Sequence, residues 1–375
     1  MAGIYIHIPF CKQACNYCNF YFSTGLGNKD KMVDALIKEI ALTKNYLQGE
    51  TLETIYFGGG TPSILYVDDL KRILDALAAN YNLNNLQELT IETNPDDLTT
   101  EKIKELSSLK AMGLNRFSIG IQSFFDEDLQ YMNRAHNSAE AQTAVKKVQD
   151  AGFEKITIDL IYGTPTMNDE RWHKNLETAF GLNVPHISSY ALTVEEKTAL
   201  DNKIRKGEAK PVDEEQAARQ FKILMDEMKR NRFEQYEISN FAKPGRYAVH
   251  NTNYWRGKKY LGLGPSAHSF NNTARRWNVA NTINYINSIE KGELPFEEEI
   301  LTPAQQVNER IMTALRTQWG LPIAEFGLRV ADLITENLAG IDQECYTFAN
   351  GVITLTDQGK LFADAIAAEL FIDEE

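Results

Sequence analysis

The sequence predicts an α/β protein that begins with an incomplete (βα)6 barrel of the TIM type and ends with a small α+β domain of winged-helix-like order. The first observation is that short β-rich runs alternate with longer helical patterns from residue 1 to about residue 230. The second is that cysteine, glycine and acidic residues recur where the predicted strands end. The third is that the last part of the chain has two helical patterns followed by a hairpin-like segment.

The barrel prediction starts from segments rich in β-branched and aromatic residues. The predicted strands are Ile4–Ile8, Thr54–Phe57, Glu88–Thr93, Arg116–Ile121, Lys155–Ile161 and His186–Leu192. Segments with apolar residues at helical spacing separate and follow them. These predicted helices are Lys31–Tyr46, Val67–Ala79, Thr100–Met112, Ser138–Ala151, Glu170–Phe180 and Glu214–Arg230. Because near-continuous apolar strands alternate with helices, we expect a parallel sheet that helices cover, with too few units to close an eight-stranded barrel.

We expect three parts in the chain. Residues 1–230 form the partial barrel, residues 231–295 form an extension, and residues 296–375 form a separate small domain. The extension is rich in Tyr, Trp, Asn and Gly, as in His250–Trp255 and Tyr260–Phe270. Its composition breaks the βα pattern, which places a boundary near residue 230.

The last part of the chain has helical patterns at Pro303–Arg316 and Phe326–Asn337, then a hairpin over Thr347–Leu355 and a final helix. Asn350 and Gly351 stand where the hairpin turns, as the favoured two-residue turn requires. This order is that of a winged helix, which suggests DNA binding. The same part, however, carries 4 Lys+Arg against 15 Asp+Glu. We therefore expect no DNA-reading role, because a negative surface repels phosphate groups.

The whole chain of 375 residues is also acidic, with 52 Asp+Glu against 39 Lys+Arg and a net charge of −13. That charge argues against nucleic acid as a partner. No window approaches 18 uninterrupted apolar residues, so we expect no transmembrane segment. The first residues show no basic leader with an apolar stretch and a cleavage site. We therefore expect a cytoplasmic protein.

Three of the four cysteines, Cys11, Cys15 and Cys18, fall in one short segment directly after the first predicted strand. In a reducing compartment such a group indicates metal or redox chemistry. Three thiolates can bind three irons of a cuboidal iron–sulfur cluster and leave the fourth iron open, because a fully ligated cluster takes four thiolates. Zinc is the alternative, but a closed zinc site needs four ligands, and no second Cys/His pair shows the required spacing.

Polar and glycine residues follow the other predicted strands in the same way. The Gly58–Thr61 turn follows the second strand, and Glu92, Gln122 and Asp159 lie at the ends of three later strands. Because the carboxyl ends of parallel barrel strands meet at one rim, we expect these residues to lie around one site with Cys11.

The spacing Cys-x3-Cys-x2-Cys after a first strand, followed by Gly-Gly-Gly-Thr-Pro after the second, resembles the radical S-adenosylmethionine superfamily. The segment from Tyr5 to Cys11 is similar to the HemN/HemW branch, which contains oxygen-independent coproporphyrinogen III dehydrogenases and heme chaperones. The resemblance covers essentially the whole chain. It implies a 4Fe–4S cluster on Cys11, Cys15 and Cys18, whose open iron binds the amino and carboxylate groups of S-adenosylmethionine.

The resemblance also implies which other residues contact S-adenosylmethionine. They are Tyr5, Gly59, Gly60, Thr61, Glu92, Gln122, Arg134 and Asp159. Glycine suits such a position because peptide groups can approach a ligand closely where no side chain intervenes. Arg134 suits a carboxylate, and the acidic residues can accept from hydroxyl or ammonium groups. His7 either touches the cluster loop or is a hydrogen-bonded structural histidine.

Two functions share this scaffold, and three features favour the heme chaperone over the dehydrogenase. The dehydrogenase pattern has a fourth cysteine two residues after the third, where this chain has Phe20. The cysteine loop starts so early that no room is left for the dehydrogenases' N-terminal extension. His250–Trp255 matches the His-Asn-x-x-Tyr-Trp pattern associated with heme binding in the chaperones. The resemblance therefore implies heme and a heme-accepting protein as partners, with His250 as the axial ligand.

The remaining motifs are assigned no chemistry. Cys345 stands apart from the other cysteines and is interpreted as a small core residue. The segment from Gly262 to Pro265 resembles a loop near the substrate end of the family's barrel. The alternative function, oxidative decarboxylation of coproporphyrinogen III, stays open at this point.

Overall fold

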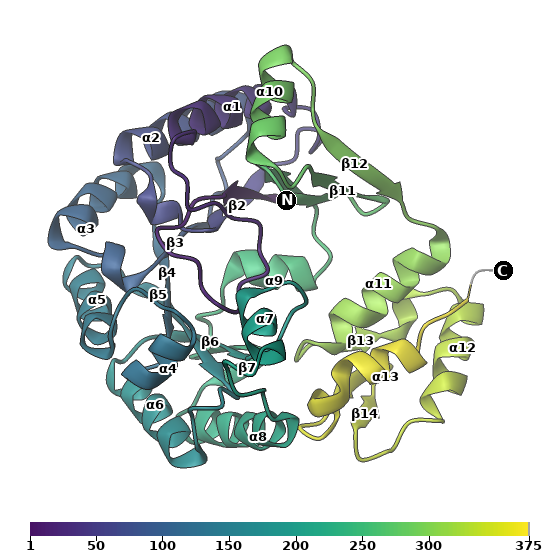
Figure 1. The fold of residues 1–375 in the computed structure, drawn as a ribbon. Coiled ribbons are helices and arrows are strands. Elements are labelled where there is room, and N and C mark those ends of the chain that lie inside the picture. The colour runs from purple at the N-terminus through teal and green to yellow at the C-terminus, as the bar shows by residue number, and fades with distance from the viewer. Residues whose placement is uncertain (374–375) are drawn as a thin grey trace.

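A computed structural model of the protein describes residues 1–373, and its centre is a curved sheet of 12 strands (Figure 1). The strand order is β12-β11-β10-β9-β1-β2-β3-β4-β5-β6-β8-β7. The predicted strands are parallel neighbours in its middle: β1 (Ala2–Ile8), β2 (Leu52–Gly59), β3 (Glu88–Thr93), β4 (Arg116–Gln122), β5 (Lys155–Tyr162) and β6 (His186–Ala191). The prediction of an incomplete parallel barrel is confirmed.

Helices cover the outside of this sheet (Figure 1). The helices before residue 231 are α1 (Lys29–Leu42), α2 (Val67–Asn80), α3 (Thr100–Ser107), α4 (Asp126–Tyr131), α5 (Ser138–Asp150), α6 (Asp169–Gly181), α7 (Ala199–Arg205) and α8 (Glu214–Arg230). Ile4, Ile6 and Ile8 of β1 are each at most 1% exposed and belong to the main hydrophobic core. Since side chains alternate along a strand, Tyr5 and His7 face the other side, the inside of the barrel. Among residues 1–373, no helix has the length and apolar character that crossing a membrane requires.

Two predicted helices end earlier than expected, α1 at Leu42 instead of Tyr46 and α3 at Ser107 instead of Met112. The pattern over Thr100–Met112 continues through Met112, but α3 ends at Ser107 and a 3-10 helix follows from Ser108. The hydroxyls of Ser107 and Ser108 each donate at 2.7 Å to a carbonyl three or four residues earlier. Such bonds compete with the α-helical pattern, so the last turn tightens.

The segment after α8 extends the sheet at both ends. On one side, β8 (Asn240–Ala242) pairs with β6 and β7 (Glu234–Glu237) pairs with β8. On the other side, β9 (Tyr260–Leu263) lies parallel to β1. The antiparallel strands that continue from it are β10 (His268–Phe270), β11 (Ala274–Asn278) and β12 (Phe296–Ile300). The helix α10 (Thr282–Lys291) connects β11 to β12 and packs against α1. The division of the chain at residues 231 and 296 stays a prediction.

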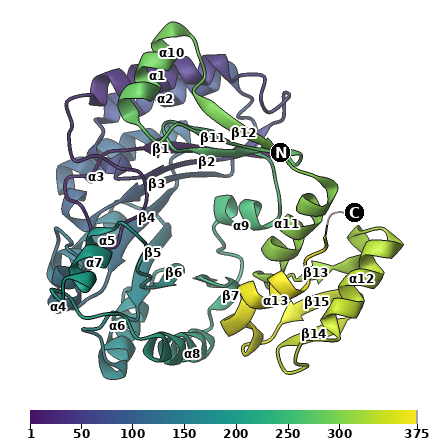
Figure 2. The same ribbon diagram turned by 45° about the vertical axis from the view of Figure 1, so that its right-hand side comes forward.

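A short helix, α9 (Val249–Trp255), lies inside the ring of strands in both views (Figures 1 and 2). The backbone N–H groups of Val249 and His250 donate to the two carboxylate oxygens of Glu88, at 2.9 and 3.1 Å. Asn253 Nδ2 donates to Glu53 Oε2 at 2.9 Å. Because Glu88 and Glu53 stand at the beginnings of β3 and β2, α9 lies at the amino-terminal ends of the strands, opposite the carboxyl ends.

The last part of the chain forms a small domain with its own core. Its elements are α11 (Pro303–Leu315), β13 (Leu321–Pro322), α12 (Leu328–Leu338), β14 (Tyr346–Ala349), β15 (Val352–Leu355) and α13 (Ala363–Glu369). The strands form a sheet in the order β13-β15-β14. The predicted hairpin is confirmed, with Asn350 and Gly351 both at positive φ, 54° and 76°, as a type I′ turn requires. Cys345 belongs to this core, as predicted.

This small domain contacts the central sheet near both of its ends (Figure 2). Beside β7, the backbone N–H of Gln318 donates to Tyr236 O at 3.0 Å. Near the other end, Arg275 of β11 forms an ion pair with Glu309 of α11. The domain therefore bridges the two ends that an incomplete barrel leaves unjoined.

Candidate functional site

The three clustered cysteines lie in a loop that leaves β1 and returns to it. Cys11 N donates to Ser23 O at 3.0 Å, and Ser23 N donates to Pro9 O at 2.8 Å. The loop therefore begins and ends at the carboxyl end of β1. This is the end of the strands at which parallel barrels carry their sites.

Asn16, in the middle of this loop, holds it against two distant segments. The residue is 6% exposed. Its backbone N–H donates to Met132 O at 3.0 Å, and its side-chain amide donates to Tyr131 O at 2.7 Å. Its carbonyl accepts from Leu200 N at 2.7 Å, and its side-chain oxygen accepts from Lys203 Nζ at 3.1 Å. All four polar groups are thus satisfied, which fixes the loop between α4 and α7.

A cavity of about 450 Å³ opens at the carboxyl ends of the strands. Most of the residues predicted from the sequence line it: Cys11, Cys15, Cys18, Gly59, Gly60, Thr61, Glu92, Gln122, Arg134 and Asp159. Tyr5 and His250 are the predicted residues that do not line it. The structure therefore brings together residues from the cysteine loop and from the ends of four strands.

Polar side chains reach two of the sulfur atoms in this cavity. Arg134 Nη1 donates to Cys15 Sγ at 3.2 Å, and Thr61 Oγ1 donates to Cys11 Sγ at 3.6 Å. Burial, with a smaller contribution from the charges of the other two cysteines, raises the pKa of the Cys18 thiol to about 11. Among the described residues, no three His, Cys, Asp or Glu side chains are arranged around a single metal ion. An iron–sulfur cluster does not require three side chains around one metal ion, because each thiolate binds a different iron.

Glu92 and Asp159 are two carboxyl groups on the cavity wall, surrounded by protein. Tyr56 Oη donates to Glu92 Oε1 at 2.7 Å, and Gly59 N donates to Glu92 Oε2 at 3.2 Å. Ser118 Oγ donates to Asp159 Oδ1 at 3.5 Å. Burial raises the pKa of Glu92 to about 7, with a further contribution from the charge of Asp159. Burial likewise raises the pKa of Asp159 to about 6, so both groups exchange protons close to neutral pH.

The glycine turn after β2 lets the backbone pass close to β1. Gly59 has a φ of 105°, in the left-handed region that a side chain disfavours. A Cβ atom at Gly60 would lie 2.6 Å from Phe10 O and 2.9 Å from Ile8 O. Neither position therefore accepts a side chain without movement of the backbone. Gly59, Gly60 and Thr61 line the cavity at this turn.

Both terminal nitrogens of the Arg134 guanidinium donate hydrogen bonds, whereas its Nε donates none to the described residues. Its Nη2 donates to Asn94 Oδ1 at 2.6 Å and to Gly120 O at 2.7 Å. Its Nε is buried and has no hydrogen-bond partner among the described residues. An unpartnered buried donor that borders a cavity fits a ligand with an acceptor group. Gln122, at the end of β4, has a φ of 68°, which turns the strand away at the same rim.

Tyr5 and His7 lie on the inner side of β1, beside the cavity. The Tyr5 hydroxyl and His7 Nδ1 are 3.2 Å apart, and His7 Nε2 lies 2.8 Å from Tyr21 O. Tyr21 follows the cysteines in the same loop. His7 is therefore a buried, hydrogen-bonded histidine that also contacts the cysteine loop.

His250 lies apart from the cavity, on α9. It is 3% exposed, with Nδ1 2.7 Å from Thr54 Oγ1 and Nε2 2.8 Å from Tyr254 Oη. Burial lowers the pKa of its ring to about 3, so the imidazole is neutral. In this arrangement both ring nitrogens are already in hydrogen bonds. Its assignment as a heme ligand stays a prediction.

Several cavity residues were not named from the sequence, among them Tyr17, Asn94, Ser118 and Tyr190. Asn94 directly follows β3, and Tyr190 is near the end of β6. The strand-end rule, applied to every unit, would have found both. Ser118 lies within β4, where only the alternation of side chains decides which face it occupies.

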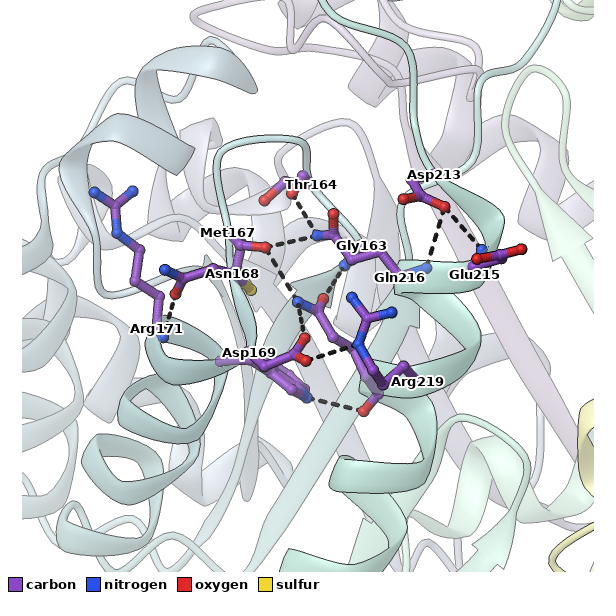
Figure 3. Close-up of polar contacts among 12 residues, drawn as sticks. Gly163, Thr164, Met167, Asn168, Asp169, Arg171, Asp213, Glu215, Gln216 and Arg219 are labelled. Carbon is purple, nitrogen blue, oxygen red and sulfur yellow. Dashed lines mark hydrogen bonds and ion pairs between the residues drawn. The ribbon is translucent and has the colours of Figure 1, made fainter.

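Hydrogen bonds from side chains of α8 hold the loop after β5 in place (Figure 3). Gly163 N donates to Gln220 Oε1 at 2.7 Å. Gln216 Nε2 donates to Thr164 O at 3.0 Å and to Met167 O at 2.6 Å (Figure 3). Two glutamine side chains thus replace the backbone bonds that this irregular segment lacks. The end of β5, which carries Asp159 and Ile161 to the cavity, is therefore rigidly placed.

The sequence matches two family profiles. The profile described as the radical SAM superfamily matches residues 5–179, and the HemN C-terminal domain profile matches residues 301–362. In the solved structures, coproporphyrinogen III oxidase (HemN) from Escherichia coli superimposes with a TM-score of 0.82, covering 99% of this chain and 90% of that one. The two sequences are 22% identical, so this similarity shows the fold.

Curated relatives match over nearly the full chain. The protein named heme chaperone HemW from Bacillus subtilis is 34% identical over 375 residues, 98% of each chain. The protein of the same name from Mycobacterium tuberculosis is 32% identical, covering 98% of this chain and 94% of that one. The one from Escherichia coli is 35% identical over 270 residues, 71% of this chain and 69% of that one. The chain therefore belongs to the HemW family within the radical SAM superfamily.

Proposed function

We propose that the protein binds a 4Fe–4S cluster, S-adenosylmethionine and heme, and that it delivers the heme to an acceptor protein. One observation carries this proposal: the three clustered cysteines border one cavity with Arg134, Glu92 and the glycine turn. The heme-binding part of the proposal is supported by the full-length relatives, which are named heme chaperones. A heme-accepting protein as partner and a cytoplasmic location stay predictions.

Cys11, Cys15 and Cys18 would hold the cluster. As thiolates they would ligate three of its irons and would leave the fourth iron for an exogenous ligand. Asn16 supports this role because it fixes the loop from both sides, so the sulfur atoms are placed before the cluster arrives. When bound and reduced, the cluster supplies the electron for cleaving S-adenosylmethionine. A closed zinc site would need a fourth protein ligand.

The same cavity would hold S-adenosylmethionine. Gly59 and Gly60 border the cavity and carry no side chains, so the ligand would be able to approach their peptide groups closely. The unpartnered Nε of Arg134 suits a carboxylate. Glu92 and Asp159 suit hydroxyl or ammonium donors, and their raised pKa values let either group hold or release a proton near pH 7. Thr61, Gln122 and Tyr5 complete the predicted set.

The second candidate function is that of a coproporphyrinogen III dehydrogenase, because the fold matches HemN over almost the whole chain. Two observations favour the chaperone instead. Phe20 stands where the dehydrogenase pattern has a fourth cysteine, and its side chain is 66% exposed at the cavity rim. The full-length relatives above 30% identity carry the chaperone name.

Anaerobic reconstitution with iron and sulfide tests the cluster and S-adenosylmethionine sites. We expect four irons per chain and an absorption spectrum that changes when S-adenosylmethionine is added. Replacing Cys11, Cys15 or Cys18 with Ser should abolish the cluster, whereas the matched change Cys345→Ser should retain it because Cys345 lies in the other core. Retention of a full cluster without one of the three cysteines would disprove this assignment.

Titration with heme and incubation with coproporphyrinogen III separate the two functions. The reconstituted protein should bind heme with defined stoichiometry and transfer it to an apo-hemoprotein. It should not consume coproporphyrinogen III when S-adenosylmethionine and a reductant are present. Turnover of that substrate without heme binding would support the dehydrogenase instead.

A further inference from the structure

The histidines of the chain differ in whether a ring nitrogen is free to bind iron. Of the six histidines, four are buried, with at most 3% of each exposed: His7, His136, His186 and His250. His173 is exposed, but it lies on the outer helix α6 and its Nδ1 is 3.5 Å from Glu227 Oε1. The sixth, His268, is exposed and forms no hydrogen bond from its ring to any described residue. An axial heme ligand needs a free imidazole nitrogen, which His268 offers.

His268 begins β10 and faces the inside of the barrel. It pairs with Trp277 of β11, and Phe270, two residues later, pairs with Arg275. Since paired residues and residues two apart share a face, these four side chains lie on one side of the sheet. Arg276, between Arg275 and Trp277, covers the rings of Tyr46 and Phe296 on the other side.

An aromatic contact identifies this face as the inner one. The ring of Tyr260 lies 4.5 Å from that of Tyr254 on α9, inside the barrel. The ring of Phe270 lies 6.2 Å from that of Tyr260, so Phe270 points the same way. His268 therefore shares the interior with α9.

His268 also lies level with Tyr5, the middle residue of β1. Tyr5 of β1 pairs with Gly262 of β9. A Cβ atom at Gly262 would lie only 2.1 Å from His268 O, so only glycine lets β10 approach β9 here. Gly262 therefore lets β10, which carries His268, lie close against β9, the strand between β10 and β1.

Flat apolar rings accompany the free imidazole. The rings of His268 and Trp277 are 6.2 Å apart with planes 30° from parallel. Phe270 adds a second ring on the same face, with the guanidinium carbon of Arg275 6.0 Å from its ring centroid. A planar apolar macrocycle with a central metal fits such a surface, because the rings cover its face while the imidazole binds the metal.

We propose that heme binds on the inner face of β10 and β11, with His268 as an axial ligand and Trp277 against the macrocycle. This rests on the proposed heme-binding function and changes the residue assigned to it. In this conformation His250 has both ring nitrogens in hydrogen bonds and lies on a helix anchored to Glu88 and Glu53. His268 binds iron without any such bond being broken.

Hemin titration of the reconstituted protein tests the assignment, read by absorption and by electron paramagnetic resonance. His268→Ala should lose the axial-imidazole signature and bind hemin roughly tenfold more weakly or worse. His250→Ala and the exposed control His173→Ala should keep the signature. Trp277→Ala should keep the signature and weaken binding by roughly two- to tenfold.

Chemical rescue separates ligation from folding. Adding free imidazole to His268→Gly should restore the axial-imidazole signature, which a merely structural histidine would not allow. Iron content and far-ultraviolet circular dichroism should match the parent chain in each variant. An unchanged signature in His268→Ala, or its loss in His250→Ala alone, overturns the assignment to His268. If the parent chain binds no hemin at all, the proposed heme function itself fails.

Discussion

The rings of Tyr56 and His250 stack inside the barrel, with centroids 5.0 Å apart and planes 24° from parallel. The hydroxyl of Tyr56 also donates to Glu92 Oε1 at 2.7 Å. Glu92 lines the cavity at the carboxyl ends of the strands, whereas His250 lies on α9 near their beginnings. One tyrosine thus connects the candidate S-adenosylmethionine site with the helix that carries the His-Asn-x-x-Tyr-Trp pattern.

The raised pKa of Glu92 predicts that the apo-protein loses stability as the pH rises. The folded state holds the proton up to about pH 7, whereas an unfolded chain releases it near its ordinary value of 4.5. Unfolding between these pH values releases a proton, so rising pH favours the unfolded state. Glu92→Gln should flatten this decline in the free energy of unfolding, measured by urea denaturation at several pH values.

Tyr56→Phe should have the opposite effect to Glu92→Gln: it should strengthen the decline in the free energy of unfolding with rising pH. The hydrogen bond from Tyr56 lowers the pKa of Glu92, so its loss should extend the decline in stability to higher pH. In the double variant with Glu92→Gln, the Tyr56 change should no longer alter the slope. Identical slopes in all of these chains would contradict the assignment of the titration to Glu92.

Asn16→Ala should destabilise the cysteine loop. The change removes two side-chain hydrogen bonds, to Tyr131 O and from Lys203 Nζ. We expect a loss of about 1–3 kcal/mol in the free energy of unfolding of the apo-protein. We also expect faster loss of iron from the reconstituted protein to a chelator. Lys203→Met should cause part of this effect, and Lys206→Met, at an exposed position on the same segment, should cause none.

Gly60→Ala should destabilise the protein through a backbone collision. The new Cβ would lie 2.6 Å from Phe10 O, and backbone atoms on neighbouring strands cannot rotate away. Relief requires the turn to move, at a cost of about 1–3 kcal/mol and with weaker binding of S-adenosylmethionine in calorimetric titration. Gly27→Ala is the matched control, because a Cβ at Gly27 meets no atom within 4 Å. Equal effects of the two changes would contradict this explanation.

Arg134→Met should lower both cluster content and affinity for S-adenosylmethionine. It removes the donors to Cys15 Sγ, Asn94 Oδ1 and Gly120 O together. Arg134→Lys should be intermediate, because an ammonium group keeps the charge but not the planar set of donors. Iron per chain and calorimetric binding measure the two effects. The exposed Arg230→Met, on α8, should leave both at the parent level.

Much of the site could be predicted because its signals are local. The cysteine segment and the glycine turn come at or just after the ends of β1 and β2, and Glu92 is the next-to-last residue of β3. The rule that parallel strands end at one rim then brings them together without any knowledge of side-chain packing. Asn94, directly after β3, and Tyr190, near the end of β6, obey the same rule, so their place at this rim is also predictable from the sequence.

Other features depend on contacts between residues far apart in the chain. Asn16 meets Tyr131 and Lys203 more than 100 positions away, and nothing near residue 16 indicates those partners. The same holds for the small C-terminal domain, whose contacts with β7 and β11 bridge the two ends of the sheet. Its elements were predictable from turn residues and helical spacing, but its position was not.

The sequence by itself determined the α/β class, the run of parallel strands and the residues that follow them, because strand and turn preferences act over a few neighbouring residues. Only the tertiary structure decided where the histidines point. His250 carries the recognisable heme pattern, yet its ring bonds to Thr54 and Tyr254 inside the barrel. His268 carries no such pattern, and its ring forms no hydrogen bond to any residue between 1 and 373. Burial and hydrogen bonding, which decide whether a nitrogen can bind iron, arise only when distant strands and helices pack together.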